Sequence, residues 1–212
     1  MVEKKVYILR YSKASPYVRK ILLAAHHLGL HENITLEVAD TNDPNDSLRG
    51  QNPTGRIPVL IKQDGKPLYD SRVILDFLER QSDNFLFPET GDLRDLALTQ
   101  AALAEGLIDS AILWVYADRF SGDQPPPELW RSHHLQKIKR GCDYLEHYIS
   151  NWVSNQPYAG SSITLAACLG YLSFRNVFNW SSNRPNLLNW YNKAAASLPG
   201  FDSTAPNAEL EM

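Results

Sequence analysis

The hydrophobic pattern of this chain changes character once, near residue 83, and this change constrains the fold more than any other feature. Before it, short apolar runs with strand-like alternation are separated by segments of helical periodicity. After it, apolar residues recur at helical spacing only. Strands that alternate with helices indicate a mixed sheet covered by helices. The sequence therefore predicts an α/β domain followed by an all-α domain.

The first part of the chain, residues 1–82, contains the predicted strands. A helix should begin at Ser15-Pro16, because serine is a favoured N-cap and proline fits the first helical position. Gly29 lies near its expected end. Ser71 is expected to cap a second helix. The predicted strands span residues 4–10, 34–39, 57–62 and 66–70; residues 40–50 are expected to form a loop with at most one helical turn.

The second part of the chain reads as helical throughout. Residues 83–92, which contain Gly, Pro and Asp, are expected to form a linker. The all-helical domain is then predicted to span residues 93–212. Its expected helices cover residues 93–121, 127–153, 164–178 and 186–197.

The charge balance argues against two classes of partner. The chain has 212 residues, with 21 Lys plus Arg against 24 Asp plus Glu and a formal net charge of −3. It offers no basic excess for nucleic acid and no polybasic run for a membrane surface. The N-terminal run VYIL is too short for a secretory signal, and no stretch approaches the roughly 18 apolar residues of a spanning helix. We therefore expect a soluble, cytoplasmic protein.

Neither the cysteines nor the histidines predict a disulfide or a metal site. Cys142 and Cys168 lie far apart, each within a predicted helix, and are expected to be free, buried thiols. His26-His27 and His133-His134 are adjacent pairs, and neighbours in a helix point about 100° apart. Because neither pair offers an obvious two-ligand site, we expect no metal.

Two features between residues 52 and 71 offer polar groups to a ligand. A proline that enters a strand, as Pro58 does, marks an edge, a strand start or a cis bond. A cis bond would expose the N–H and C=O of Ile57 to another extended backbone. Ser71 offers its hydroxyl and N–H groups to an anion, helped by the helix dipole. Each feature alone is equally explained by an ordinary strand start or helix cap.

Taken together, these segments resemble the glutathione transferase family. The resemblance rests on NPTGRIPVL at residues 52–60, the following hairpin, and Tyr69-Asp70-Ser71 opening a helix, downstream of a strand that leads to Ser15-Pro16. It extends over the whole chain. It implies a thioredoxin-like first domain, a helical second domain, glutathione as co-substrate and a homodimer.

The resemblance also assigns roles to residues of the first domain. Ile57, before an expected cis bond to Pro58, would hydrogen-bond the cysteinyl backbone of glutathione. Ser71 would hold the γ-glutamyl carboxylate, and Asp70 would lie near the γ-glutamyl ammonium. Arg56 is expected to meet the glycyl carboxylate, although a solvated surface charge explains it as well.

The family pattern places Ser15 where the catalytic residue stands. A helix N-terminus and a hydroxyl donor can lower the pKa of the glutathione thiol, whose ordinary value is about 8.5. Ser15 would then donate a hydrogen bond to the thiolate, with Tyr11 and Ser12 as alternatives. Members that run disulfide exchange carry cysteine in this place, so the resemblance favours attack on an electrophile or reduction of a peroxide. The alternative is a non-catalytic module that binds glutathione or a protein.

The helical domain is expected to carry the site of the second substrate, a small hydrophobic molecule. Tyr11, Trp114 and Tyr116 are the candidate walls of this pocket, together with part of the C-terminal tail. Members of the family usually open a central helix with a Ser/Thr-x-x-Asp capping box. Here Thr164 is present but Ala167 replaces the acid, so we expect a weakened cap, unless Ser161 or Ser162 compensates.

Overall fold

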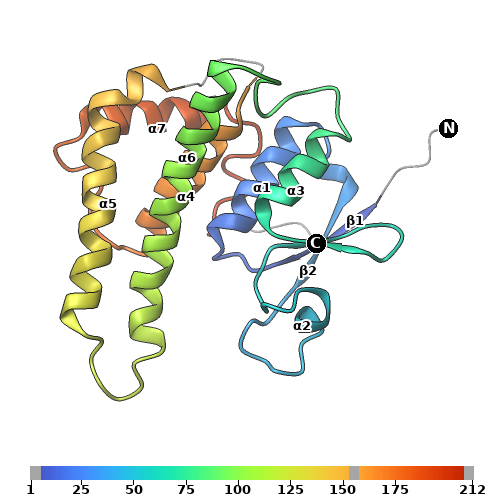
Figure 1. Cartoon of the computed structure of the whole chain (residues 1–212), viewed down its shortest axis with the longest axis horizontal. Coiled ribbons are helices and arrows are strands. Elements are labelled where there is room, and N and C mark those ends of the chain that lie inside the picture. The colour runs from blue at the N-terminus through green and yellow to red at the C-terminus, as the bar shows by residue number, and fades with distance from the viewer. Residues whose placement is uncertain (1–5, 153–157, 208–212) are drawn as a thin grey trace. The chain divides into compact units, whose positions relative to one another are not determined.

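The computed structural model describes residues 6–152 and 158–207 and divides the chain into two compact units (Figure 1). The first unit comprises the chain up to Leu86 together with the segment that begins at Leu198, and the second spans Phe87–Ser197. Residues 4 and 5, at the predicted start of the first strand, and residue 153, at the predicted end of a helix, lie outside the described residues. The domain limits at 82 and 93 stay a prediction.

The first unit is built on a mixed sheet, as the sequence predicts. The strands lie in the order β2-β1-β3-β4, with β1 parallel to β2 and antiparallel to β3, and with β3 antiparallel to β4. Helices α1 and α3 pack against each other (Figure 1). The elements are β1 (Tyr7–Tyr11), α1 (Pro16–His27), a 3-10 turn (His31–Asn33), β2 (Ile34–Val38), α2 (Leu48–Gln51), β3 (Val59–Ile61), β4 (Pro67–Leu68) and α3 (Ser71–Glu79).

The helix starts of this unit follow local sequence rules, with one correction. Ser15 is the N-cap of α1, and its Oγ accepts a 3.2 Å hydrogen bond from the N–H of Val18. The predicted cap of α3 at Ser71 is wrong by one residue. Asp70 is the N-cap, because its carboxylate accepts the N–H of Arg72 at 3.0 Å. Ser71 is thereby the first residue of the helix, and its hydroxyl makes no hydrogen bond to any described residue.

The described part of the second unit contains helices and no strand, as predicted. Helix α4 packs against both α5 and α6, and α7 packs against α5 and α6 (Figure 1). Helix α6 is buried along nearly its whole length. The elements are α4 (Asp92–Arg119), α5 (Glu128–Tyr148), a 3-10 turn (Ile149–Asn151), α6 (Gly160–Phe174) and α7 (Pro185–Ser197).

The predicted start of α6 at Thr164 is wrong. The helix begins at Gly160, and Ala159 stands at the N-cap without a side-chain cap bond. Thr164 lies in the second turn, where its hydroxyl donates a 2.7 Å hydrogen bond to the carbonyl oxygen of Gly160. Thr164 and Ala167 therefore do not occupy the positions of a capping box at the start of α6. A threonine inside a helix commonly bonds to the carbonyl four residues earlier. The presence of a threonine therefore does not by itself identify the start of a helix.

Both cysteines are free and buried, as expected. Burial raises the pKa of the Cys142 thiol to about 12, and burial raises that of Cys168 well above its ordinary value. Both thiols therefore stay protonated and unreactive at neutral pH.

Helix α4 is long and apolar enough, by length and composition alone, to cross a membrane, and no other described helix is. Half of its most apolar stretch is buried inside the structure. Since α4 packs against α5 and α6, its apolar residues have the surroundings of a core helix.

The last described segment of the chain packs on α1. Arg19 donates a 3.0 Å hydrogen bond to the carbonyl oxygen of Phe201, and its guanidinium lies 4.7 Å from the centre of the Phe201 ring. Gly200 adopts a positive φ of 75° directly against the ring of His26. These contacts hold the segment around Gly200 and Phe201 against α1 within the first unit.

Candidate functional site

The register of the sheet brings three segments to one edge. Arg10 of β1 pairs with Val59 of β3, so the residues after Tyr11 lie beside those before Val59. Leu60 pairs with Leu68 of β4, so the residues after β4 reach the same edge. In antiparallel pairs, the end of one strand adjoins the start of the other. The segments 12–15, 56–58 and 70–71, which carry the predicted first-unit site residues other than Tyr11, therefore meet at this edge.

The turn at residues 52–56 is organised by one buried side chain. The Nδ2 group of Asn52, which is only 3% exposed, donates a 2.9 Å hydrogen bond to the carbonyl oxygen of Arg56. Its Oδ1 accepts the N–H and the hydroxyl of Thr54 at 3.1 and 2.9 Å. Gly55 has a φ of +63°, which glycine adopts without steric cost. The side chain of Asn52 thus fixes the backbone that leads into Ile57.

The peptide bond between Ile57 and Pro58 is cis, as expected. Among the described residues, the N–H and the carbonyl of Ile57 make no hydrogen bond. Its side chain packs on the cluster of Ala39, Leu48 and Val59. The backbone of Ile57 is therefore held in place by packing, while both its polar groups stay available to an extended peptide.

Ser71 and Asp70 lie at the start of α3. Ser71 is only 4% exposed, and its hydroxyl and N–H have no partner within the described part of the chain. An N-terminal N–H group and a hydroxyl at the positive end of a helix form a suitable place for a carboxylate. The Asp70 side chain is exposed, and one of its oxygens already accepts the N–H of Arg72.

Ser15 lies half-buried at the start of α1. As an N-cap, its oxygen accepts the Val18 N–H through a lone pair, so its hydroxyl hydrogen can still be donated. Ser12 is joined to it, since the N–H of Ser15 donates a 3.0 Å bond to the Ser12 carbonyl. Tyr11 is 2% exposed and offers almost no side-chain surface. Which of the three meets a ligand sulfur stays a prediction.

The remaining predicted site residues differ in their surroundings. Arg56 is exposed, and its side chain makes no hydrogen bond or ion pair with any described residue. Trp114 is half-buried on α4, with the guanidinium of Arg131 lying 4.4 Å from the centre of its ring. Tyr116, on the same helix, packs edge-to-face on Phe120 at 5.5 Å.

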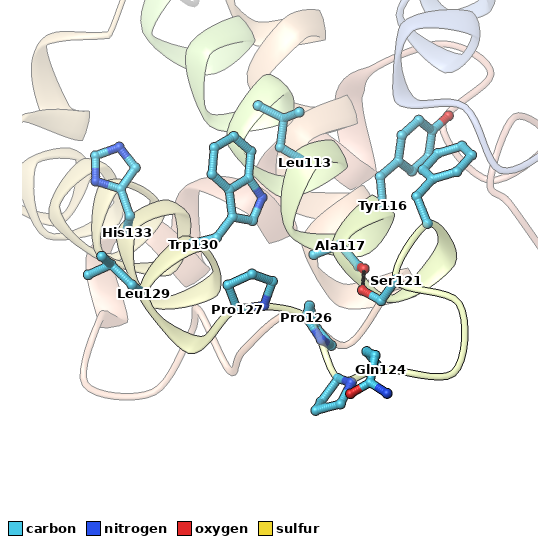
Figure 2. Close-up of a pocket in the computed structure, with 12 residues that line it drawn as sticks. Leu113, Tyr116, Ala117, Ser121, Gln124, Pro126, Pro127, Leu129, Trp130 and His133 are labelled. Atoms are coloured by element: carbon cyan, nitrogen blue, oxygen red, sulfur yellow. Dashed lines mark hydrogen bonds between the residues drawn. The ribbon is translucent and has the colours of Figure 1, made fainter.

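Tyr116 lines an open groove of about 970 Å³ in the second unit, and Trp114 does not (Figure 2). The groove lies between the end of α4, the start of α5 and the segment that joins them. Its walls are mainly apolar, with Ser121, Gln124 and His133 as polar groups. The apolar lining comes from Leu113, Tyr116, Ala117, Phe120, Pro125, Pro126, Pro127, Leu129 and Trp130.

Sequence reasoning missed the main aromatic residues of this groove. Phe120 and Trp130 are exposed although they are large and apolar. The available signal was a pair of large aromatic residues on either side of the Pro125-Pro126-Pro127 segment, because three successive prolines cannot continue a helix and therefore mark the connection between two helices. No group of three or more potential metal ligands occurs among the residues described.

Comparisons with known proteins agree with this geometry. Residues 14–81 match the family described as glutathione S-transferase, N-terminal domain. The chain is 30% identical over 183 residues to the uncharacterized GST-like protein YibF of Escherichia coli K12, covering 84% of this chain and 88% of that protein.

Solved structures give the same result. A glutathione transferase family member from Pseudomonas fluorescens Pf-5, with bound glutathione, superimposes with a TM-score of 0.87 at 34% identity, covering 95% of this chain and 100% of that one. A glutathione S-transferase from Methylobacillus flagellatus KT, with bound glutathione, gives 0.86 at 30% identity, covering 94% and 99%.

Proposed function

The chain belongs to the glutathione S-transferase family, and on this premise we propose that it binds glutathione at the sheet edge and joins it, through its sulfur, to a small apolar electrophile. The observation that carries the proposal is that Ile57 and Ser71 meet at one edge of the sheet, each with polar groups that bond to no described residue. A γ-glutamyl peptide presents an extended backbone and a carboxylate, which suit these two places.

Each part of the tripeptide has a partner in this proposal. The Ile57 N–H and carbonyl pair with the cysteinyl backbone in the manner of an added strand. The Ser71 hydroxyl and N–H hold the γ-glutamyl carboxylate, and Asp70 attracts the γ-glutamyl ammonium. The exposed guanidinium of Arg56 meets the glycyl carboxylate.

Ser15 acts on the sulfur. Its hydroxyl donates a hydrogen bond to the thiolate, and the N-terminus of α1 adds a favourable dipole. The thiolate then attacks an electrophilic carbon, so a carbon–sulfur bond forms while the leaving group departs with its electron pair. An organic peroxide is the alternative acceptor.

The second substrate occupies the apolar groove of the helical unit. The rings of Tyr116, Phe120 and Trp130 favour a flat, apolar molecule. Trp130→Ala is expected to raise the KM for an aromatic electrophile while the affinity for glutathione stays unchanged. Trp190→Ala, on α7, is the matched control. An unchanged KM in Trp130→Ala would place the second substrate elsewhere.

Calorimetric titration with glutathione tests the proposal directly. Wild type should bind, and Ser71→Ala should bind about 10- to 100-fold more weakly, since a hydrogen bond to a charged group contributes about 1.5–3 kcal/mol. Ser150→Ala, an exposed serine of the second unit, should bind as wild type does. Absence of binding by wild type would overturn the proposal. Binding without turnover of any electrophile or peroxide would favour a non-catalytic glutathione-binding module.

We also propose that the protein is a cytoplasmic homodimer, as its family membership suggests. Sedimentation equilibrium should then give twice the chain mass of 24.0 kDa. A mass near one chain would contradict the dimer without affecting the glutathione site.

A further inference from the structure

Arg10 is a buried arginine of β1, and a residue paired with it across the sheet lies next to the candidate site. It is 3% exposed, and in the sheet it stands between Glu37 of β2 and Val59 of β3. Val59 directly follows Pro58. A guanidinium keeps its charge in proteins, so burial here requires several partners.

The described partners of Arg10 lie between residues 37 and 51, which include the end of β2, α2 and the loop that joins them and lead to the turn at residues 52–56. Its Nη1 donates to the Ser47 Oγ at 2.6 Å and to the Gln51 Oε1 at 2.8 Å. Its Nη2 donates to the Asp46 Oδ1 at 2.7 Å and to the Val38 carbonyl at 3.2 Å. Its Nε lies 3.3 Å from Glu37 Oε1, at ion-pair distance but without hydrogen-bond geometry.

Asp46 extends this network into the loop. Its carboxylate also accepts the N–H of Asp40 at 2.8 Å and that of Leu48 at 2.7 Å. These backbone bonds, followed by Arg10, hold the pKa of Asp46 below its ordinary value. The loop that begins after β2 is therefore fastened to the sheet through one guanidinium and one carboxylate.

The network reaches the candidate site through α2. Leu48 is fully buried with Ala39 and Val59, and Ile57 packs on this cluster. The N–H of Asn52 donates to the Leu48 carbonyl at 2.7 Å. A shift of α2 would therefore move both Asn52 and the surface on which Ile57 rests.

We propose that Arg10 is a positioning residue for glutathione: it fixes α2, and through α2 the turn from Asn52 to Ile57 that receives the cysteinyl backbone. The inference rests on the proposed function. Arg10 is too buried to touch a ligand, so it acts only through the turn. Arg10 should affect the affinity for the peptide and leave the chemistry of the sulfur unchanged, because Ser15, the N-cap of α1, is not part of this hydrogen-bond network.

The test compares Arg10→Lys and Gln51→Ala with wild type. Glutathione affinity should fall about tenfold in Arg10→Lys and about threefold in Gln51→Ala, in line with one or more lost hydrogen bonds. Amide hydrogen exchange at residues 52–57 should become faster. The pKa of the bound glutathione thiol, followed by thiolate absorbance, should not change.

Arg184→Lys is the matched control, since Arg184 also joins a carboxylate, Asp143, at 2.6 Å, but in the second unit. It should leave glutathione affinity unchanged. If wild type binds glutathione and both Arg10→Lys and Gln51→Ala bind equally well, the inference is wrong. A shifted thiol pKa in either variant would also overturn it. If Arg10→Lys does not fold, the glutathione affinity of Gln51→Ala alone decides whether the inference holds. Failure of wild type to bind would instead refute the proposed function.

Discussion

The side-chain amide of Asn52 donates a 2.9 Å hydrogen bond to the carbonyl oxygen of Arg56, and so closes the turn that enters the strand at Val59. Because the same side chain accepts two bonds from Thr54, its loss leaves several polar groups without a partner. Asn52→Ala should lower the free energy of unfolding by about 1–3 kcal/mol. It should also weaken glutathione binding about tenfold, as measured by calorimetry.

Asn52→Asp separates the two contributions of this side chain. It keeps an acceptor for Thr54 but cannot donate to Arg56. An affinity in this variant as poor as in Asn52→Ala would identify the bond to Arg56 as the important one. Asn192→Ala, an exposed change on α7, should alter neither quantity.

Replacement of Ser15 separates capping from thiol activation. Ser15→Ala should cost about 0.5–2 kcal/mol of stability through loss of the cap. Ser15→Asp keeps a cap acceptor, so its stability should stay near that of wild type. In both variants the pKa of bound glutathione should rise toward about 8.5, because the hydroxyl donor is gone. A thiol pKa that does not move in either variant would shift the role to Tyr11 or Ser12.

Gly200→Ala should destabilise the first unit more than its backbone conformation alone explains. A Cβ at Gly200 would lie 2.2 Å from the ring of His26, which is itself stacked on His31 at 4.3 Å. Gly122 also has a positive φ, of 59°, but open space around it. Gly200→Ala should therefore lose about 1–3 kcal/mol more than Gly122→Ala. Equal losses in thermal or urea unfolding would show that the His26 ring moves aside freely.

Buried histidine should make the protein sensitive to mild acid. His134 is 4% exposed, and neither ring nitrogen has a partner among the described residues. Burial, then Lys137 and His133, hold the pKa of His134 below its ordinary value. The unfolded chain thus takes up the proton more readily. Stability is full above about pH 6.5 and falls as the pH drops through the lowered folded value.

His134→Gln, which does not titrate, should show a smaller loss of unfolding free energy than wild type between about pH 7.5 and about pH 5. His147→Gln, at an exposed position of the same helix, should follow wild type. If the pH profile of His134→Gln coincides with that of wild type, His134 does not contribute to acid sensitivity.

Local sequence rules recovered most of the elements and failed where neighbours decided the outcome. Ser15-Pro16 marked the start of α1 correctly, since a cap depends on adjacent backbone only. Thr164 was misread as a cap because its hydroxyl bonds equally well inside a helix. The N-cap of α3 was predicted at Ser71 but is Asp70, because both side chains can cap a helix and the sequence alone does not distinguish between them.

The sequence by itself determined the two-part architecture, because hydrophobic periodicity is a local property of the chain. It also predicted the segment from Asn52 to Ser71 as the place for a peptide ligand, because this motif is contiguous. Only the tertiary structure decided that Arg10 bonds to Gln51, directly before that segment, and that Phe120 and Trp130 share a groove. Arg10 lies far from its partners along the chain, and Phe120 and Trp130 lie on either side of the connection between two helices. Their contacts arise from strand register and helix packing, which no local pattern records.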